Sequence, residues 1–276
     1  MNNSVLMLAK YNKNKIILVL LLSSAFFSCI PKRYPDALSV DDALKHFEIA
    51  DGFTVETFAS EPQVLSPVDM VFDEQGNIFV LEMADYPGQP AAGEGKGRIK
   101  LLKDSNGDGK IDSAIVFADK LPSATSMLPW KGGLIVTAAP DILFLKDTTG
   151  DFRADSKEIM FTGFFANNSE AQITSLRLGV DNWIYANNNG QAGEVHAPHD
   201  TGASLSMGGS DFRFRPDKGL FEKESGSGQF GLATDDWGNR FYTQNTLHIQ
   251  QAPIPWRYLH RHPYLPSDRA EKNISD

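Results

Sequence analysis

One short pattern recurs four times along this chain of 276 residues, and it restricts the possible fold more than any other feature. The pattern consists of apolar residues, an Asp, a tight Gly-Asn turn and a run of β-forming residues. The copies are residues 71–80, a weaker copy without the Asp at 130–136, a shortened copy at 178–185, and residues 232–242. Corresponding positions (Val80, Val136, Ala186 and Thr243) are 56, 50 and 57 residues apart.

A period near fifty residues with a strand–turn–strand unit in each copy indicates an all-β fold of the β-propeller type. The Gly-Asn pairs suit hairpin turns that need a positive φ. A β-sandwich is the alternative, although a sandwich does not need such similar copies. About four blades are present, and the polar tail 269–276 shows no closing strand. We therefore expect an incomplete ring, either the front of a longer product or a truncated copy, which aggregates or is partly ordered alone because its sheet edges are unpaired.

The first 28 residues have the pattern of a signal peptide. Three lysines at positions 10, 13 and 15 precede the apolar run 16–27, which is shorter than the roughly 20 residues of a membrane span. The sole cysteine, Cys29, follows small residues as in a bacterial lipobox, although Phe26 replaces the usual Leu. We predict a lipoprotein signal peptide (1–28) and a linker (29–38) before a propeller domain (39–276). Acylated Cys29 would anchor the protein to a bacterial membrane on its periplasmic or cell-surface side. The alternative is a plain secretory signal with an incidental cysteine.

Charge and cysteine content exclude several kinds of partner. Removing residues 1–28 takes away three lysines and no acid, which changes the formal net charge from −9 to −12. Such an acidic domain has no electrostatic reason to bind nucleic acid or anionic lipid. With one cysteine, it has no internal disulfide, no cysteine-based zinc site and no Cys-x-x-Cys-His haem attachment motif.

A short helix is predicted before the first repeat. Ser39 is a good N-cap, Asp42 follows three residues later, and Ala43, Leu44 and Phe47 share one helical face. The helix should end before Gly52.

Further motifs carry a family resemblance. Among them are Glu82-Met-x-Asp85-Tyr86-Pro-Gly88, Gly208-Gly-Ser-Asp211-Phe-Arg213-Phe214 and Asp235-Asp-Trp-Gly-Asn-Arg240-Phe241, together with residues 52–56, 59–62, 67–73, 178–185, 229–231 and 257–264. Over nearly the whole mature chain, the sequence resembles the opening of large exported propeller proteins of the planctomycete and verrucomicrobial type. These are described as membrane-bound dehydrogenases or haem-binding proteins and are distantly related to glucose/sorbosone dehydrogenases.

The resemblance implies an exported oxidoreductase that acts on a sugar or polyol. Electrons would pass to a quinone-type cofactor such as pyrroloquinoline quinone (PQQ), or to a haem module or cytochrome c partner. Two departures weaken this implication. The Cys-x-x-Cys-His motif is absent, and residues 172–176 read Gln-Ile-Thr-Ser-Leu where relatives often have a His and an Asn.

Two acidic loops resemble calcium-binding loops. The first places oxygen ligands at Asp104, Asn106, Asp108, Asp112 and the carbonyl of Lys110, but Ile115 replaces the Glu of an EF-hand and strands flank the loop. The second has Asp147, Thr149, Asp151 and Asp155, without a glycine after Asp151. We predict that Ca²⁺ stiffens both hairpin loops; two solvated acidic turns are the alternative.

Candidates for catalysis or ligand binding are fewer. Glu82, Asp85 and Tyr86 follow the first repeat strand, where a carboxylate could act as a base or hold a ligand; the alternative is a hairpin corner with a buried tyrosine. His196 and His199, three residues apart in a polar loop, could bind a metal or serve as acid and base, or have no function.

Arg177, Asp211, Arg213 and Arg240 fall at strand positions of the repeats. The first three are predicted to bind a cofactor in the channel, with ion pairs between blades as the structural alternative. The sequence thus supports two main hypotheses, a sugar or polyol dehydrogenase and a non-catalytic propeller that binds carbohydrate or protein. A third is an inactive fragment.

Overall fold

The computed structural model describes residues 34, 36–88, 90, 94–200, 202, 204–262, 264 and 270–274. The chain forms two compact units, Met1–Glu56 and Thr57–Asp276. In the first unit, helix α2 spans Val40–Leu44. The Ser39 hydroxyl accepts a hydrogen bond from the Asp42 backbone N–H (3.2 Å) and donates one to the Asp42 carboxylate (2.7 Å). This reciprocal capping confirms the predicted short helix, which ends before Gly52.

The second unit is all-β apart from one short helix among its described residues, α3 (Trp256–Leu259). The described residues of this unit form four antiparallel sheets of four strands each and one two-stranded sheet. The first sheet comprises β1 (Pro67–Phe72), β2 (Ile78–Glu82), β3 (Gly97–Lys103) and β4 (Ser113–Leu121). The second comprises β5 (Ser126–Trp130), β6 (Gly133–Ala138), β7 (Asp141–Lys146) and β8 (Ser156–Phe161). The third comprises β9 (Thr174–Leu178), β10 (Ile184–Asn187), β13 (Asp211–Arg215) and β14 (Leu220–Glu224), with the separate hairpin β11 (Glu194–Val195) and β12 (Leu205–Ser206) inserted. The fourth comprises β15 (Leu232–Thr234), β16 (Arg240–Tyr242), β17 (Gln250–Gln251) and β18 (Lys272–Asn273).

The four sequence repeats form the first hairpin of each sheet: β1–β2, β5–β6, β9–β10 and β15–β16. In the first hairpin, the Asp73 carboxylate accepts the backbone N–H groups of Gln75 and Asn77, and Gly76 has a φ of 81°. The last hairpin repeats this arrangement around Asp235, where Gly238 has a φ of 83°. The recurring Asp and Gly are therefore turn residues, which explains why the pattern marks the hairpins.

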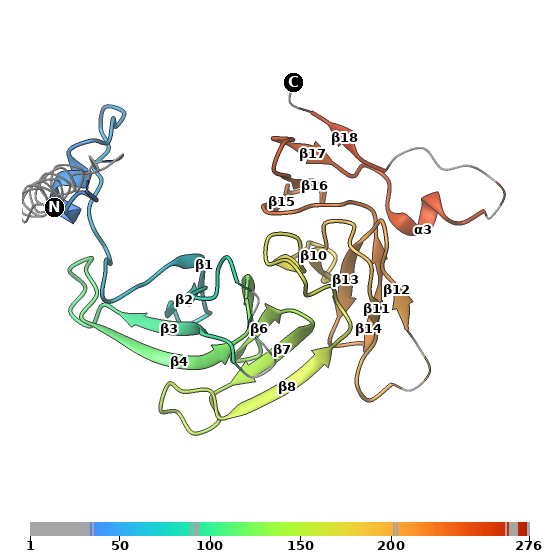
Figure 1. Ribbon diagram of the computed structural model, residues 1–276, viewed down its shortest axis with the longest axis horizontal. Helices are drawn as coiled ribbons and strands as arrows, with labels where there is room; N and C mark the ends of the chain where they lie inside the picture. The colour runs from blue at the N-terminus through green and yellow to red at the C-terminus, as the bar shows by residue number, and fades with distance from the viewer. Residues whose placement is uncertain are drawn as a thin grey trace, which may run out of the picture. The chain divides into compact units, whose positions relative to one another are not determined.

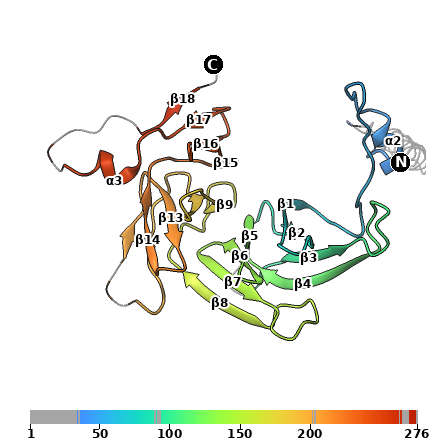
Figure 2. The same ribbon diagram turned by 180° about the vertical axis from the view of Figure 1, so that it is seen from behind.

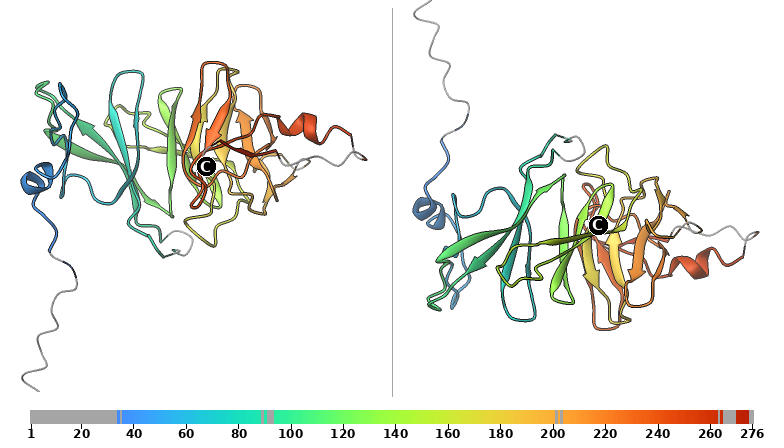
Figure 3. Two further views of the ribbon diagram at one scale, coloured as in Figure 1. Left: turned by 90° about the horizontal axis from the view of Figure 1, so that it is seen from above. Right: turned by 90° about the horizontal axis from the view of Figure 1, so that it is seen from below.

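The sheets follow one another in chain order (Figure 1), and the reverse view shows the same sequence of sheets (Figure 2). The first strands of successive sheets contact each other: β1 contacts β5, β5 contacts β9, and β9 contacts β15. Views along a perpendicular direction show the strands of each sheet running side by side (Figure 3). Residues at the beginning of these first strands consequently come close together in space.

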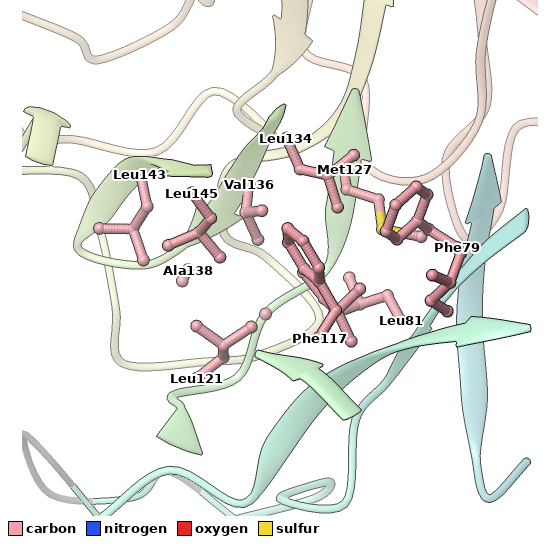
Figure 4. Close-up of a cluster of buried hydrophobic side chains, with 13 residues drawn as sticks. Phe79, Leu81, Phe117, Leu121, Met127, Leu134, Val136, Ala138, Leu143 and Leu145 are labelled. Carbon is pink, nitrogen blue, oxygen red and sulfur yellow. The ribbon is translucent and has the colours of Figure 1, made fainter. Parts of the chain in front are cut away.

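Apolar clusters join the first three sheets. Figure 4 shows the cluster between the first and second sheets, in which Phe79 and Leu81 face Met127, Leu134 and side chains around them. A second cluster, rich in phenylalanine, joins the second and third sheets. The apolar cluster between the third and fourth sheets is smaller, with Tyr185, Leu232, Tyr242 and Ala252 as its buried members. Polar residues complete that interface.

Two short elements in the last part of the chain were not predicted. Strand β18 (Lys272–Asn273) lies in the tail that was expected to end without a closing strand, and it pairs with β17 as the fourth strand of its own sheet. Helix α3 was not predicted either. Both segments are too short to show a period of 2 or 3.6 residues, so the sequence pattern could not reveal them.

Candidate functional site

A pocket of about 430 Å³, lined by both polar and apolar side chains, lies where the first strands of all four sheets begin. Its lining comes from β1, from β5 and the residue before it, from β9 and the loop before it, from the loop after β2, and from the segment that leads into β15. The lining residues are Val68, Asp69, Met83, Tyr86, Thr125, Ser126, Ser169, Glu170, Gln172, Thr174, Ser175, Arg177, Gln229, Phe230 and Gly231. A concave site with convergent polar groups is the usual form of a small-molecule binding site.

Asp69 is the carboxylate on the β1 side of the pocket. Its two oxygens accept the backbone N–H groups of Met70 (2.9 Å) and Met127 (2.8 Å), which attaches β1 to β5. Burial raises the pKa of Asp69 above its ordinary value, although these hydrogen bonds and the positive charge of Arg177 oppose that effect. The pocket therefore contains a carboxylate with a perturbed pKa beside a guanidinium.

Tyr86 and Glu170 form a pair on another wall of the pocket. The Tyr86 hydroxyl donates a hydrogen bond to the Glu170 carboxylate, which raises the pKa of the phenol. The Glu170 carbonyl accepts a hydrogen bond from the Gln229 side chain (2.9 Å). Residues far apart in sequence are thus linked across the pocket. Tyr86 is 57% exposed, so the alternative of a buried tyrosine at this hairpin corner is wrong.

Gln172 is the pocket residue whose hydrogen bonding is incomplete. Its side chain is buried and its Nε2 donates to the carbonyl of Ser123, whereas its Oε1 has no hydrogen-bond partner among the described residues. Buried polar atoms are nearly always paired in folded proteins. The pocket wall therefore contains an acceptor that lacks a donor.

Glu82 and Asp85, predicted as catalytic, have structural contacts instead of a place in the pocket lining. Glu82 is 1% exposed and forms ion pairs with Arg98 and with Lys100 (2.9 Å). Asp85 accepts backbone N–H groups from Lys96, Gly97 and Ser123. Each carboxylate holds neighbouring segments of the chain together. Tyr86 is the member of this predicted group that reaches the pocket.

The predicted histidines lie elsewhere. Thr162 and His196 form an isolated antiparallel bridge, and the His196 ring contacts the carbonyl of Glu194 (3.1 Å). His199 is exposed in the loop that follows. No group of three His, Cys, Asp or Glu side chains in the described part of the chain is arranged to hold a metal ion.

Of the three predicted cofactor-binding residues, Arg177 lines the pocket, whereas Asp211 and Arg213 are buried in β13. Arg213 forms ion pairs with Glu222 and with Glu224 (3.0 Å), and Arg240 of the fourth sheet lies 3.4 Å from Glu224. The ion pair of Arg240 with Glu224 connects two sheets, as the structural alternative predicted.

The two acidic loops occupy equivalent places, since 104–112 joins β3 to β4 and 147–155 joins β7 to β8. Asp104 accepts the N–H groups of Gly107 (2.7 Å) and Gly109 (2.9 Å), and Asp147 accepts those of Gly150 (2.7 Å) and Phe152 (2.7 Å). The N–H of Gly109 and other backbone donors lower the pKa of Asp104. Phe152 adopts a φ of 64° where the first loop has Gly109, and so the missing glycine does not prevent the same loop conformation.

Calcium binding by these loops stays a prediction, because the three aspartates of each described loop are not gathered into a metal-holding group in the structure. Adding Ca²⁺ is expected to raise the melting temperature by about 3 °C or more, because the ion would favour the folded loop. Asp108→Ala should reduce this increase, whereas Asp119→Ala, on an exposed position of β4, should not. Differential scanning calorimetry with Ca²⁺, Mg²⁺ and EGTA measures the effect. Equal melting temperatures in Ca²⁺ and EGTA would contradict the prediction.

Cys29, the predicted lipidation site, and the predicted signal peptide lie outside the described residues. Within the described part, no helix is long and apolar enough to cross a membrane.

The pocket residues that the sequence analysis missed are Asp69, Glu170, Gln172 and Gln229. Asp69 lies in the segment 67–70 that contributed to the family resemblance, and Gln172 stands at a noted departure from it. Either observation could have directed attention to the pocket. No local pattern marked Glu170 or Gln229.

The fold and the pocket define an all-β protein of successive antiparallel sheets whose first strands meet at one pocket. Residues 39–276 match the family described as "Domain of unknown function (DUF7133)", and the chain belongs to this family. No curated protein matches the chain. Among solved structures, the chain is similar to the extracellular domain of a protein described as a hybrid two-component system, BT4673, from B. thetaiotaomicron. The two are 13% identical with a TM-score of 0.25, over 73% of this chain and 35% of that chain, so the chain spans about a third of that structure.

Proposed function

We propose that the four sheets are blades of a β-propeller. Each sheet is four-stranded and antiparallel, and its strands are consecutive in the chain except where the β11–β12 hairpin is inserted into the third sheet. The first strands of neighbouring sheets contact one another. In a propeller, the first strands of the blades line the central channel. The pocket at the beginning of these strands would then lie at the channel mouth.

We further propose that this pocket binds a sugar or polyol. The observation that carries the proposal is the convergence of carboxylate, hydroxyl, amide and guanidinium side chains with the apolar Val68, Met83 and Phe230 in one pocket. A sugar hydroxyl both donates and accepts hydrogen bonds, so it can pair with each of these polar groups, while the carbon skeleton contacts the apolar ones. The cavity volume of about 430 Å³ is within the usual range for small ligands.

The remaining lining fits the same class of ligand. Asp69 can accept hydrogen bonds from hydroxyl groups and Arg177 can donate to hydroxyl oxygens. Phe230, which is 43% exposed, provides an apolar surface for the C–H face of a sugar ring. Since Asp69, Glu170 and Arg177 leave the lining with one net negative charge, a neutral ligand suits it better than an anion.

The test is a binding measurement with a panel of neutral sugars and polyols by isothermal titration calorimetry. Arg177→Met is expected to weaken binding about 10- to 100-fold, because it removes charge-assisted hydrogen bonds. Arg257→Met removes the same charge from an exposed position outside the pocket and should leave the affinity unchanged. Absence of binding across the panel, or equal loss in both variants, would contradict the proposal.

Oxidation of the bound sugar is the second candidate function, favoured by Asp69 because a carboxylate with a raised pKa suits general-base catalysis. The described pocket lining does not fit PQQ, whose three carboxylates would meet two carboxylates and a single arginine. We therefore derive no step through that cofactor. A dye-reduction assay with PQQ, Ca²⁺ and a panel of aldoses tests this argument. Reduction of the dye would contradict it, and a cytochrome c protein would then be the expected electron acceptor.

Export and lipid anchoring through Cys29 complete the proposal. The basic n-region, short apolar run and lone cysteine support them. A pocket on an exported domain would meet sugars outside the cytoplasm.

A further inference from the structure

The interface between the third and fourth sheets contains a group of buried polar side chains. Asn187, Asn188, Asp211, Ser225 and Tyr242 are each no more than 1% exposed. They come from β10 and the residue after it, from β13, from the loop after β14 and from β16. The other two interfaces between sheets have large apolar clusters. The polar group therefore needs an explanation other than packing.

Four oxygen atoms in this group have no hydrogen-bond partner among the described residues. They are Asn187 Oδ1, Asn188 Oδ1, Ser225 Oγ and the Tyr242 hydroxyl. Each loses its contact with water on burial and gains none in the protein, which is unfavourable. All four atoms belong to residues that adjoin Asp211 or the loop packed on it, and buried polar atoms of this kind are paired in folded proteins with water, an ion or protein groups.

Two glycines bring these groups together around Asp211. The Asp211 carboxylate accepts the backbone N–H groups of Asn188 (2.9 Å) and Gly228 (3.4 Å). A Cβ atom at Gly226 would collide with the Asp211 carboxylate and lie 3.4 Å from the Tyr242 ring, and one at Gly228 would collide with the Asn187 amide. Hence the loop approaches all three side chains closely only because glycine occupies both positions.

The charge of Asp211 is incompletely compensated. In the described part of the chain, no Lys or Arg forms an ion pair with it. Arg240 is near enough to act on Asp211 electrostatically, but it donates to the Ser225 carbonyl (2.7 Å) and lies 3.4 Å from Glu224. Glu271 adds a second negative charge nearby. Burial accordingly raises the pKa of Asp211 to about 7.

We propose that this polar group binds a monovalent cation, Na⁺ or K⁺, between the third and fourth sheets. All the unpaired atoms are oxygens, which are the ligands that hard cations prefer. The group has one carboxylate, whereas calcium sites usually have several, so a single positive charge matches it. The cation also ties down the glycine-rich loop 225–231, and residues 229–231 of that loop line the pocket described above.

The test compares melting temperatures at pH 8.5 in NaCl, KCl and choline chloride at equal ionic strength, with EGTA present so that the acidic loops bind no calcium. At this pH the Asp211 carboxylate is mostly ionised. We expect Na⁺ or K⁺ to raise the melting temperature of the wild type by about 3–6 °C over choline, as for a ligand well above its Kd. Asp211→Asn should abolish this increase.

Tyr242→Phe keeps the proposal testable if the Asp211 variant does not fold. Its hydroxyl has no partner among the described residues, so the variant should melt in choline at the wild-type temperature or slightly above it, yet gain less from Na⁺ or K⁺. Identical wild-type melting temperatures in the three salts would overturn the proposal. So would an undiminished cation effect in the folded variants.

Discussion

Replacing Phe212 with alanine is expected to lower the free energy of unfolding by about 3–5 kcal/mol. Phe212 is fully buried in β13, where its ring contacts Phe161 (5.3 Å between centroids), Phe164 (5.1 Å) and Phe214 (5.5 Å). Removing the ring takes away apolar contacts and leaves a cavity between the second and third sheets that stiff neighbouring rings cannot fill. Urea denaturation followed by circular dichroism measures the loss.

Phe72→Ala is the matched control. Phe72 is 58% exposed at the end of β1, so the same change there should alter the free energy of unfolding by less than about 1 kcal/mol. Equal losses in the two variants would show that Phe212 does not have the buried role assigned to it.

Glu82→Gln is expected to lower the free energy of unfolding by about 3 kcal/mol. The glutamine keeps the shape and can still accept the N–H of Leu65, which lies 2.7 Å from the carboxylate. It removes the negative charge that Lys100 faces, and Lys100 is itself only 8% exposed on its side chain. A buried ammonium without its counter-ion is unfavourable. Glu74→Gln, on the exposed β1–β2 turn, is the control and should have little effect.

The pH dependence of the Glu82 variant provides a further test. Burial alone would raise the pKa of Glu82, but Arg98, Lys100 and the Leu65 N–H outweigh it and the pKa is lowered. A lowered pKa means that the carboxylate stabilises the fold above its unfolded pKa of about 4.3, and that this stabilisation disappears as the pH falls through the folded value. The difference between wild type and Glu82→Gln should therefore be largest near neutral pH and shrink in acid. A difference independent of pH would contradict the ion-pair explanation.

Local features of the fold could be predicted from the sequence. Ser39 and Asp42 marked a short helix, and an Asp with a Gly-Asn pair marked the first hairpin of the first and fourth sheets. These signals act within a few residues, because a capping side chain or a glycine at positive φ satisfies its own neighbourhood. The same is true of the acidic loops, whose conformation is held by hydrogen bonds from adjacent N–H groups to Asp104 and Asp147.

The candidate site could be predicted only in part. Tyr86 and Arg177 were identified and do line the pocket, whereas Glu82 and Asp85 do not. The position of a residue at the end of a strand does not predict which side chain, distant in the sequence, it will contact. Glu82 was chosen because it ends β2, yet its direction is determined by Arg98 and Lys100 on β3. Such partners are visible only once the strands are paired.

The all-β class, the four hairpins, the short helix and the two acidic turns all follow from the amino-acid sequence, since each depends on the backbone preferences of nearby residues. Only the folded chain shows that Asp69, Gln172 and Gln229 share a pocket, and that Asp211 is buried among unpaired oxygens. The three pocket residues come from β1 and from the segments that lead into β9 and β15, and they lie far apart along the chain. Their proximity follows from the packing of whole sheets against one another, which is a collective result of burial and not of any local pattern.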